Sequence, residues 1–550
     1  MNFSNTQKLQ PLSMKDRIYI KHWLELKPKN YSSPTDFYYL KIANTIYSEI
    51  KNYEPMLSTV LKKNEQIEFS CFITCYFEDI ISKASIWHTF KTLYYQFYKK
   101  KLPFFDIDED YIDDEINYED VTFLIGYYMN TLQTNKFISP YNNFIKQLAY
   151  TIMNIFEEEY EYAPENHKLK KIYQFNGNFD EFYEVRTFMR TIFFDTFLLK
   201  IDIHKQLNNI IIDILDTNKE ESFDTIELII REAEEEFTHK RTSKLLALNA
   251  KDWVKAIIGK THKHYSDIDN ISKKVLGVFL YKKQNAKTVF VEHIASGMPF
   301  EITKKSLEHH QDFNKDDIVH IGLVRYRNEW WFSGSLAKQP FDADLILDKK
   351  NSREDRAKVN FLQDQKKLRN SLKKQELAFL KFNHNSHLVF INGNKINDFL
   401  SNFYAYYNNS LKLTPDQIEN YDKRTKKDGY LKTNKKQIDL FYSDEDEEKV
   451  VMFFNPNSGI EMYHDITNAF PDEQNPFFTG EDVEEVKSML MNPFYSVELV
   501  NYFMKNYKDK LSLFKKEPYK SYLKDLDFLL RFWKQDNYKA EIHITHIDEK

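Results

Sequence analysis

Residues 289–302 read VFVEHIASGMPFEI, and this stretch decides how the middle of the chain folds. Apolar and polar side chains alternate on both sides of residues 295–297, as they do in two strands joined by a tight turn. Gly297 can adopt the left-handed backbone conformation that such a turn needs. We therefore predict a hairpin in which Val289, Val291 and His293 share one face of the first strand, opposite Phe290, Glu292 and Ile294, and in which Phe300 and Ile302 return on the neighbouring strand.

Further short runs rich in β-branched and aromatic residues surround this hairpin. Together they predict five strands, at residues 275–284, 287–294, 298–303, 316–327 and 329–336. Five short strands within residues 271–340 favour a small SH3-like β-barrel, because closing the sheet removes exposed strand edges.

The flanking sequence has a different texture on each side of the barrel. Residues 1–265 show repeated helical spacing of apolar residues, such as the stripe Tyr39, Ile42, Ile46 and Ile50, and predict a mostly helical domain. Residues 341–383 predict a basic amphipathic helix or linker, with an apolar seam formed by Phe361, Leu368, Leu372 and Phe379. Residues 384–550 mix helix and strand patterns. The predicted fold class is multidomain α+β.

Composition bounds what the protein can be. Its 550 residues are 42% hydrophobic and 16% aromatic, which favours folded domains over disorder. The net charge of −6 argues against indiscriminate coating of nucleic acid. With no signal-peptide pattern and no apolar run of membrane-spanning length, we expect a cytoplasmic protein without a membrane span. Cys71 and Cys75 lie four apart on a predicted helix and are expected to be buried thiols.

Two candidate ligand-binding loops lack residues that their motifs require at fixed positions. A phosphate loop needs a glycine five residues before the Gly-Lys-Thr at residues 259–261, and Val254 stands there. A calcium loop beginning at Asp106 needs glycine at its sixth position and glutamate at its twelfth, where Tyr111 and Asn117 stand. We interpret the first as the end of a helix and the second as an acidic surface loop.

Catalytic and metal templates are incomplete as well. Glu236 and His239 have the Glu-x-x-His spacing of carboxylate-bridged metal sites, but the other such pair, Glu461 and His464, falls on a predicted strand. Ser296 beside His293 lacks the preceding glycine of a nucleophile elbow and is followed by a strand. A His-x-Thr segment near the C-terminus is half of a two-histidine phosphoesterase signature. No catalytic residue, metal ligand or cofactor follows from the sequence.

Basic surface is the remaining signal. Residues 349–381 contain 11 Lys and Arg against four Asp and Glu, and residues 423–436 contain seven against one. Basic segments beside aromatic residues suit RNA or single-stranded DNA, through phosphate neutralisation and base stacking. The candidate nucleic-acid-binding residues are Lys366, Lys367, Arg369, Lys373, Lys374, Lys423, Arg424, Lys426, Lys427 and Tyr430.

Three long segments, residues 22–50, 293–336 and 453–478, resemble a family of uncharacterised cytosolic proteins of Bacteroidota defined by a domain of unknown function. The middle segment is also similar to the small barrel that accompanies SecC-type zinc-binding tails. That similarity is carried by Ser296, Gly297, Phe300, Ile302, Asp316, Asp317, Ile318 and Leu323. This chain departs from the pattern because it lacks a cysteine cluster for zinc. Neither resemblance implies a catalytic residue.

These observations favour a non-catalytic interaction or adaptor protein that binds a protein or ribonucleoprotein partner. The alternative is a nucleic-acid-associated protein that uses the barrel and the two basic segments. A third hypothesis is an enzyme, such as a phosphoesterase, whose active-site residues come together only on folding.

Overall fold

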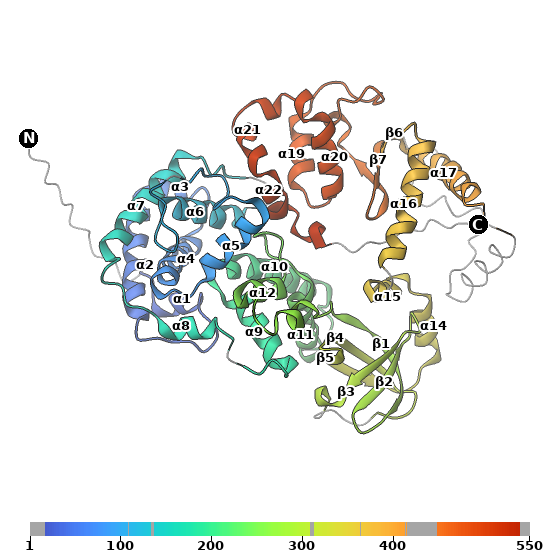
Figure 1. Ribbon diagram of the computed structural model, residues 1–550, viewed down its shortest axis with the longest axis horizontal. Helices are drawn as coiled ribbons and strands as arrows, with labels where there is room; N and C mark the ends of the chain where they lie inside the picture. The colour runs from blue at the N-terminus through green and yellow to red at the C-terminus, as the bar shows by residue number, and fades with distance from the viewer. Residues whose placement is uncertain are drawn as a thin grey trace, which may run out of the picture. The chain divides into compact units, whose positions relative to one another are not determined.

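The computed structural model describes residues 17–107, 109–133, 137–175, 177–307, 313–362, 365–412, 414 and 448–539 (Figure 1). The chain forms two compact units, one holding residues up to 271 together with 524–528, and the other holding the remainder. Helices fill the N-terminal part, a five-stranded barrel occupies the middle and an α/β region follows. The predicted multidomain α+β class is confirmed.

The first unit is built from helices joined by short loops, as the helical periodicity of its sequence predicts. Its helices are α1 (Ile20–Leu24), α2 (Asp36–Ile50), α3 (Glu54–Leu57), α4 (Lys63–Ser82), α5 (Ile86–Tyr98), α6 (Tyr118–Leu132), α7 (Asn143–Glu159), α8 (His167–Ile172), α9 (Phe182–Asp195), α10 (Phe197–Thr217), α11 (Phe223–Lys240), α12 (Ala250–Ile258) and α13 (Tyr265–Asp269).

Helix α4 runs through the core of this unit. Most of its side chains are buried, including the thiols of Cys71 and Cys75, as expected. The predicted stripe on α2 is also buried and packs against α4. An aromatic network surrounds α4, with Phe77 stacked on Phe156 at 4.6 Å between ring centroids. Burial of these large rings accounts for much of the stability of the unit.

The barrel contains β1 (Val275–Gln284), β2 (Thr288–His293), β3 (Pro299–Thr303), β4 (Ile318–Tyr326) and β5 (Glu329–Gln339), in the closed order β1-β2-β3-β5-β4. Val291 pairs with Phe300 across the predicted hairpin, and Gly297 turns the chain with φ +70°. The inward-facing residues of the hairpin are buried in the apolar barrel core. The predicted hairpin is confirmed, and so is the face shared by Val289, Val291 and His293.

The segment after the barrel is broken into shorter pieces than its pattern suggests. It forms α14 (Ala343–Asn351), α15 (Arg353–Ala357) and α16 (Gln365–Phe382). Ser352 ends the first helix and caps the second by accepting the Asp355 N–H at 3.1 Å. The predicted apolar seam is consequently divided, since Phe361 packs on the barrel core while Phe379 packs on the C-terminal sheet.

The C-terminal region places α16 and α17 (Ile396–Ser410) on an antiparallel sheet of β6 (Leu388–Asn392), β7 (Lys449–Asn455) and β8 (Gly459–His464). The turn at residues 456–458 joins β7 to β8, as its Asn and Gly content favours. The helices α19 (Val483–Met491), α20 (Val497–Tyr507), α21 (Tyr519–Tyr522) and α22 (Leu526–Trp533) follow.

Candidate functional site

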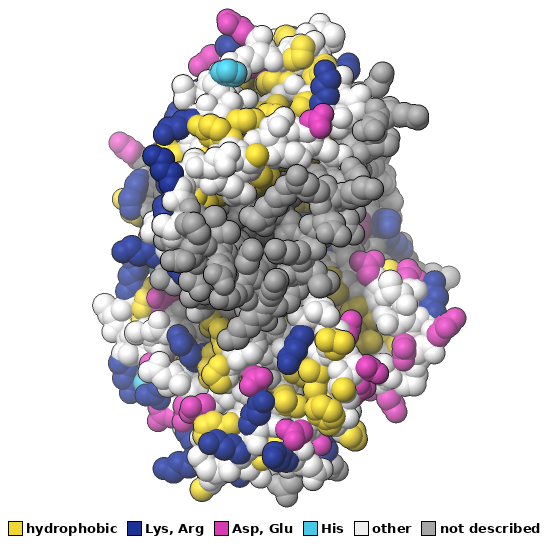
Figure 2. Space-filling model, turned by 90° about the vertical axis from the view of Figure 1, so that its right-hand side faces the viewer, with side chains coloured by type: hydrophobic (Ala, Val, Ile, Leu, Met, Phe, Trp, Pro, Cys, Tyr) yellow, Lys and Arg dark blue, Asp and Glu magenta, His cyan; other side chains and the backbone are white. Residues whose placement is uncertain are grey.

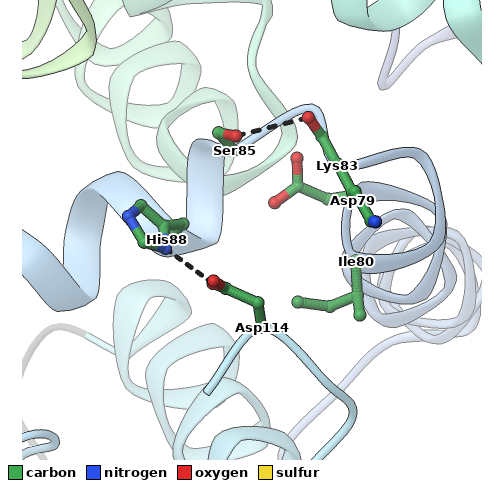
Figure 3. A pocket seen from close by; sticks show the side chains of 6 residues that line it. All are labelled: Asp79, Ile80, Lys83, Ser85, His88 and Asp114. Atoms are coloured by element: carbon green, nitrogen blue, oxygen red, sulfur yellow. Dashed lines mark hydrogen bonds and ion pairs between the residues drawn. The ribbon is translucent and has the colours of Figure 1, made fainter.

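A pocket of about 320 Å³ opens where α4 turns into α5 (Figure 3). The buried carboxylate at this pocket is Asp79, which accepts backbone N–H bonds from Ile86 at 3.2 Å and Trp87 at 2.8 Å. Burial raises the pKa of Asp79 to about 6, although these two bonds oppose the rise. Asp79 therefore acts first as the cap of α5, where a carboxylate satisfies N–H groups that lack intrahelical partners.

The mouth of this pocket contains a serine, a histidine and an aspartate that do not form a catalytic chain. His88 Nδ1 lies 2.6 Å from Asp114 Oδ1, and both side chains are more than half exposed. Ser85 Oγ instead donates to the carbonyl of Lys83 at 3.3 Å (Figure 3). Because a nucleophilic serine must bond to its base, this geometry supports no Ser-His-Asp triad.

The hairpin of α10 and α11 has an unusual outer half, which we call the hairpin tip, residues 210–230. Its base is packed, with Leu207 and Phe237 buried. Its outer half carries ten apolar side chains, and none of them is buried: Ile210, Ile211, Ile212, Ile214, Leu215, Phe223, Ile226, Leu228, Ile229 and Ile230. Phe223 is 79% exposed and Ile212 is 55% exposed. Helix faces of this kind are normally covered, so the tip is a candidate binding surface.

The predicted basic residues of α16 lie on one exposed surface. The side chains of Lys366, Lys367, Arg369, Lys373 and Lys374 are all exposed, whereas Leu372 and Phe379 face the core. Lys373 pairs with Glu376 at 2.7 Å. Tyr406 of α17 is 38% exposed and contacts Phe382 near the end of α16. The structure thus brings five cations together on the exposed side of α16, with the exposed Tyr406 ring near the far end of that helix.

The second predicted basic segment, with Lys423, Arg424, Lys426, Lys427 and Tyr430, lies outside the described residues. Figure 2 shows Lys and Arg side chains along the left-hand edge of one face, whereas its lower part mixes them with Asp and Glu. Basic surface is therefore local on this face, in keeping with the negative net charge.

Ser296 and His293 meet at the end of the barrel. His293 Nδ1 lies 2.8 Å from Ser296 Oγ, closer than two neighbours in one hairpin are expected to lie. The side chain of His293 is fully buried, and burial lowers its pKa to about 4. A Cβ on Gly277 would lie 2.8 Å from the His293 ring, so glycine makes room for it. A substrate cannot reach a ring packed in this way, and the pair is structural.

The remaining motifs have structural roles. Gly259 ends α12 with φ +78°, which supports the interpretation of the Gly-Lys-Thr segment as a helix end. Glu236 pairs with Lys240 on the surface of α11, while His239 is buried and stacks on Phe182. Within the described ranges, no group of three or more His, Cys, Asp or Glu side chains could hold a metal ion.

Sequence reasoning missed the hairpin tip. The signal was present, since five of the six residues 210–215 are Ile or Leu. An apolar run on a helix ordinarily indicates burial, and only the fold shows that the described part of the chain leaves this one partly exposed.

Comparison with known proteins adds one finding. No curated protein and no solved structure matches this chain. No helix in the described part of the chain has the length and apolar character needed to cross a bilayer. A family model does match residues 17–292, which include the helical unit and the first two barrel strands. The chain therefore belongs to the family described as protein of unknown function (DUF3843).

Proposed function

We propose that this protein is a non-catalytic adaptor that binds a partner protein through the hairpin tip. One observation carries the proposal: ten apolar side chains gather on residues 210–230, of which four are exposed and the other six are only partly buried. Leaving such a patch in water is unfavourable by roughly 25 cal/mol for each Å² of apolar surface. A partner that covers the patch would recover this free energy, and contiguous apolar surface of this kind marks interaction sites.

The charges around the patch indicate the chemistry of the partner. Residues 210–230 contain six Asp and Glu and a single Lys. A partner segment that combines apolar residues with Lys or Arg would match both properties, because complementary charge speeds association and rejects acidic competitors. We propose a basic, amphipathic segment of another protein, either free or within a ribonucleoprotein. The two buried free thiols support a cytoplasmic setting for this complex.

Site-directed photocrosslinking in the native host tests the proposal. A photoreactive phenylalanine analogue replaces Phe223 at the tip or, as the control, Tyr150 on α7, which is 64% exposed. We expect a specific partner protein to crosslink at position 223, and we expect that protein not to crosslink at position 150. Mass spectrometry should locate the crosslink in a segment of positive net charge.

Two results would contradict this proposal. The same proteins could be captured from both positions, or the chain could crosslink only to a second copy of itself. The variant Leu215→Asp should abolish the crosslink from position 223 while leaving the circular dichroism spectrum unchanged, since Leu215 is 45% exposed.

A second candidate function is nucleic-acid binding, favoured by the five exposed cations of α16. Replacing Lys366, Lys367, Lys373 and Lys374 by Gln should weaken binding to single-stranded RNA and flatten its dependence on salt. The matched control replaces the exposed lysines Lys41, Lys146, Lys260 and Lys505. Equal affinity of the two quadruple variants would argue against this function.

A further inference from the structure

A groove lies along α9 in the helical unit, and it is formed by two adjoining hollows. One hollow of about 510 Å³ is walled by the loop before α2, by α8 and by α9, α10 and α11. The other, of about 530 Å³, is walled by α8, the loop that follows it and α9. Ile172, Thr187 and Thr191 line both hollows. We call the combined feature the α9 groove.

Cations gather at one end of the α9 groove. Arg186 and Arg190 stand one turn apart on α9, and Lys29 lies opposite on the loop before α2. The Nε of Arg186 is buried and has no hydrogen-bond partner among the described residues. The Lys29 side chain is exposed and makes no ion pair within the described ranges. Asp195 and Glu234 line the same hollow. Each guanidinium has five N–H donors, so Lys29 and the donors that these carboxylates leave unused remain for an anion.

The two guanidinium groups are held in place by α11. Arg186 Nη1 lies 3.2 Å from Glu235 Oε1, and Arg190 Nη2 lies 2.9 Å from Glu234 Oε2. Their planes also sit over rings, with the Arg190 guanidinium 5.2 Å from the centroid of Phe194. Ordering of these long side chains before binding reduces the entropy that an anion would otherwise have to overcome.

An uncharged histidine lies at the same end. Burial lowers the pKa of His204 to about 4, and Lys200 and Lys29 add to this effect. Its Nε2 lies 3.0 Å from the carbonyl oxygen of Phe194, which assigns the proton to Nε2 and makes Nδ1 an acceptor. His204 can thus accept a hydroxyl proton of a ligand without adding positive charge.

Aromatic side chains form the other end. Phe175 and Tyr183 line the second hollow, and Phe188 lies 5.1 Å from Phe175 between ring centroids. Flat apolar groups stack on such rings, with each stacked base contributing about 1–3 kcal/mol in nucleic-acid sites. The groove therefore offers cations at one end and rings at the other.

We propose that the α9 groove binds a small phosphate monoester joined to an aromatic ring, with the phosphate at Arg186, Arg190 and Lys29 and the ring against Phe175 and Tyr183. Glu234, Glu235 and Asp195 offset much of the positive charge here. Two guanidinium groups and an ammonium group still match a phosphate, whose three outer oxygens accept several charge-assisted hydrogen bonds, better than they match a carboxylate. This site lies apart from the hairpin tip, and the assignment does not depend on the adaptor function.

Isothermal titration calorimetry on the full chain tests the assignment, with adenosine monophosphate, adenosine and inorganic phosphate as probes. We expect saturable binding of the monophosphate, and weaker binding of the other two. Arg190→Gln should weaken the monophosphate about tenfold, because hydrogen bonds to charged groups are lost. Lys29→Gln should weaken it about threefold, as expected for an exposed cation. The control Arg231→Gln, at a surface pair with Glu227, should leave the affinity unchanged.

The assignment is overturned if none of the three probes binds up to about 10 mM. It is overturned equally if adenosine binds as tightly as its monophosphate, or if Lys29→Gln and Arg190→Gln both retain full affinity. Arg190 also pairs with α11, so circular dichroism must show that its variant is folded. If the Arg190→Gln variant is unfolded, the affinity of Lys29→Gln for the monophosphate is the deciding measurement. This exposed lysine makes no ion pair within the described ranges, so its replacement is not expected to unfold the protein.

Discussion

The core of the helical unit contains buried carboxylates, whereas the core of the barrel is a cluster of apolar side chains. Glu78, Asp79 and Asp120 are all buried inside the helical unit, at 0%, 3% and 0% exposure. The barrel core is a cluster of apolar side chains with His293 packed against it, although Lys274 and Asp317 are also buried in the barrel, at 1% and 7% exposure. Buried carboxylates are unfavourable unless donors surround them, so the core of the helical unit needs polar partners that the apolar cluster of the barrel does not.

Those partners come from distant parts of the chain. Lys27 pairs with Glu78 and lies over the ring of Trp23, 4.0 Å from its centroid. Asn166 also donates to Glu78, at 2.7 Å. Burial alone would lower the pKa of Lys27, but Cys75 and Glu78 raise it above its ordinary value. The specificity of the helical unit therefore rests on a few polar contacts, whereas that of the barrel rests on alternation along each strand.

The largest expected effect follows from removing the cation of this cluster. Lys27→Met leaves the Glu78 carboxylate buried without its partner and should lower the free energy of unfolding by about 4 kcal/mol. Urea unfolding of the full chain, followed by circular dichroism, measures the change. Adding Glu78→Leu should restore most of the loss.

The control for this prediction is Lys41→Met, which removes a lysine that pairs with Glu159 but is 72% exposed. Its effect should be below about 1 kcal/mol. If Lys27→Met has no greater effect than Lys41→Met, the view that buried charge determines the stability of this core is wrong.

The barrel should respond to lost volume instead. Ile321 is fully buried in its core, and Ile321→Ala should cost about 3 kcal/mol through lost burial and the cavity left behind. Hydrogen exchange of β1 and β4 reports this loss within the barrel. Arg325→Ala on the exposed face of β4 serves as the control, with an expected change within about 0.5 kcal/mol. Comparable exchange in the two variants would contradict the prediction.

The same contrast explains what could be predicted from the sequence. Strand alternation is a local pattern, and it was enough to predict all five barrel strands, the turn at Gly297 and the face that His293 shares with Val289 and Val291. Helical periodicity likewise predicted the buried stripe of α2 and the exposed basic side of α16. The domain limits and the similarity to SecC-associated barrels stay predictions.

The pattern could not predict contacts between residues far apart in sequence. Lys27 and Glu78 are separated by 51 residues, and neither carries a local sign that the other is its partner. The α9 groove similarly collects side chains from five segments of the helical unit. The exposure of the hairpin tip could not be predicted for another reason. Apolar spacing along a helix does not show whether a helix face contacts a neighbouring element or the solvent.

Lowering the pH should change the stability of the two cores in opposite directions. His293 has a pKa of about 4 when folded and 6.5 in its ordinary state, so its contribution to stability is present above pH 6.5 and is lost as the pH falls towards 4. We expect the barrel to lose about 2 kcal/mol between pH 6.5 and pH 4.5. Hydrogen exchange of the barrel strands, measured at both pH values and compared with urea unfolding, reports this loss. The variant His293→Gln should show a smaller loss of stability between the two pH values.

Asp120 provides the opposite sign in the helical unit. Burial raises its folded pKa to about 6 from 3.8, so its contribution is present below pH 3.8 and is lost as the pH rises through 6. Asp120→Asn should remove this pH dependence from hydrogen exchange in α6.

The prediction for His293 would be contradicted if hydrogen-exchange protection of the barrel strands were the same at the two pH values, both in the unmodified protein and in His293→Gln. The histidine would then not determine how the barrel responds to acid.

The smallest expected effect concerns the hydrogen bond between Ser296 and His293. Ser296→Ala removes the partner of His293 Nδ1 while the ring stays buried, and should cost about 1 kcal/mol of unfolding free energy. Ser58→Ala, at an exposed site in the helical unit, is the control. Because the serine also accepts the Met298 N–H at 3.3 Å, exchange should increase first at the turn. If Ser296→Ala matches the control, the bond is a by-product of the turn, and the barrel core is determined by apolar packing alone.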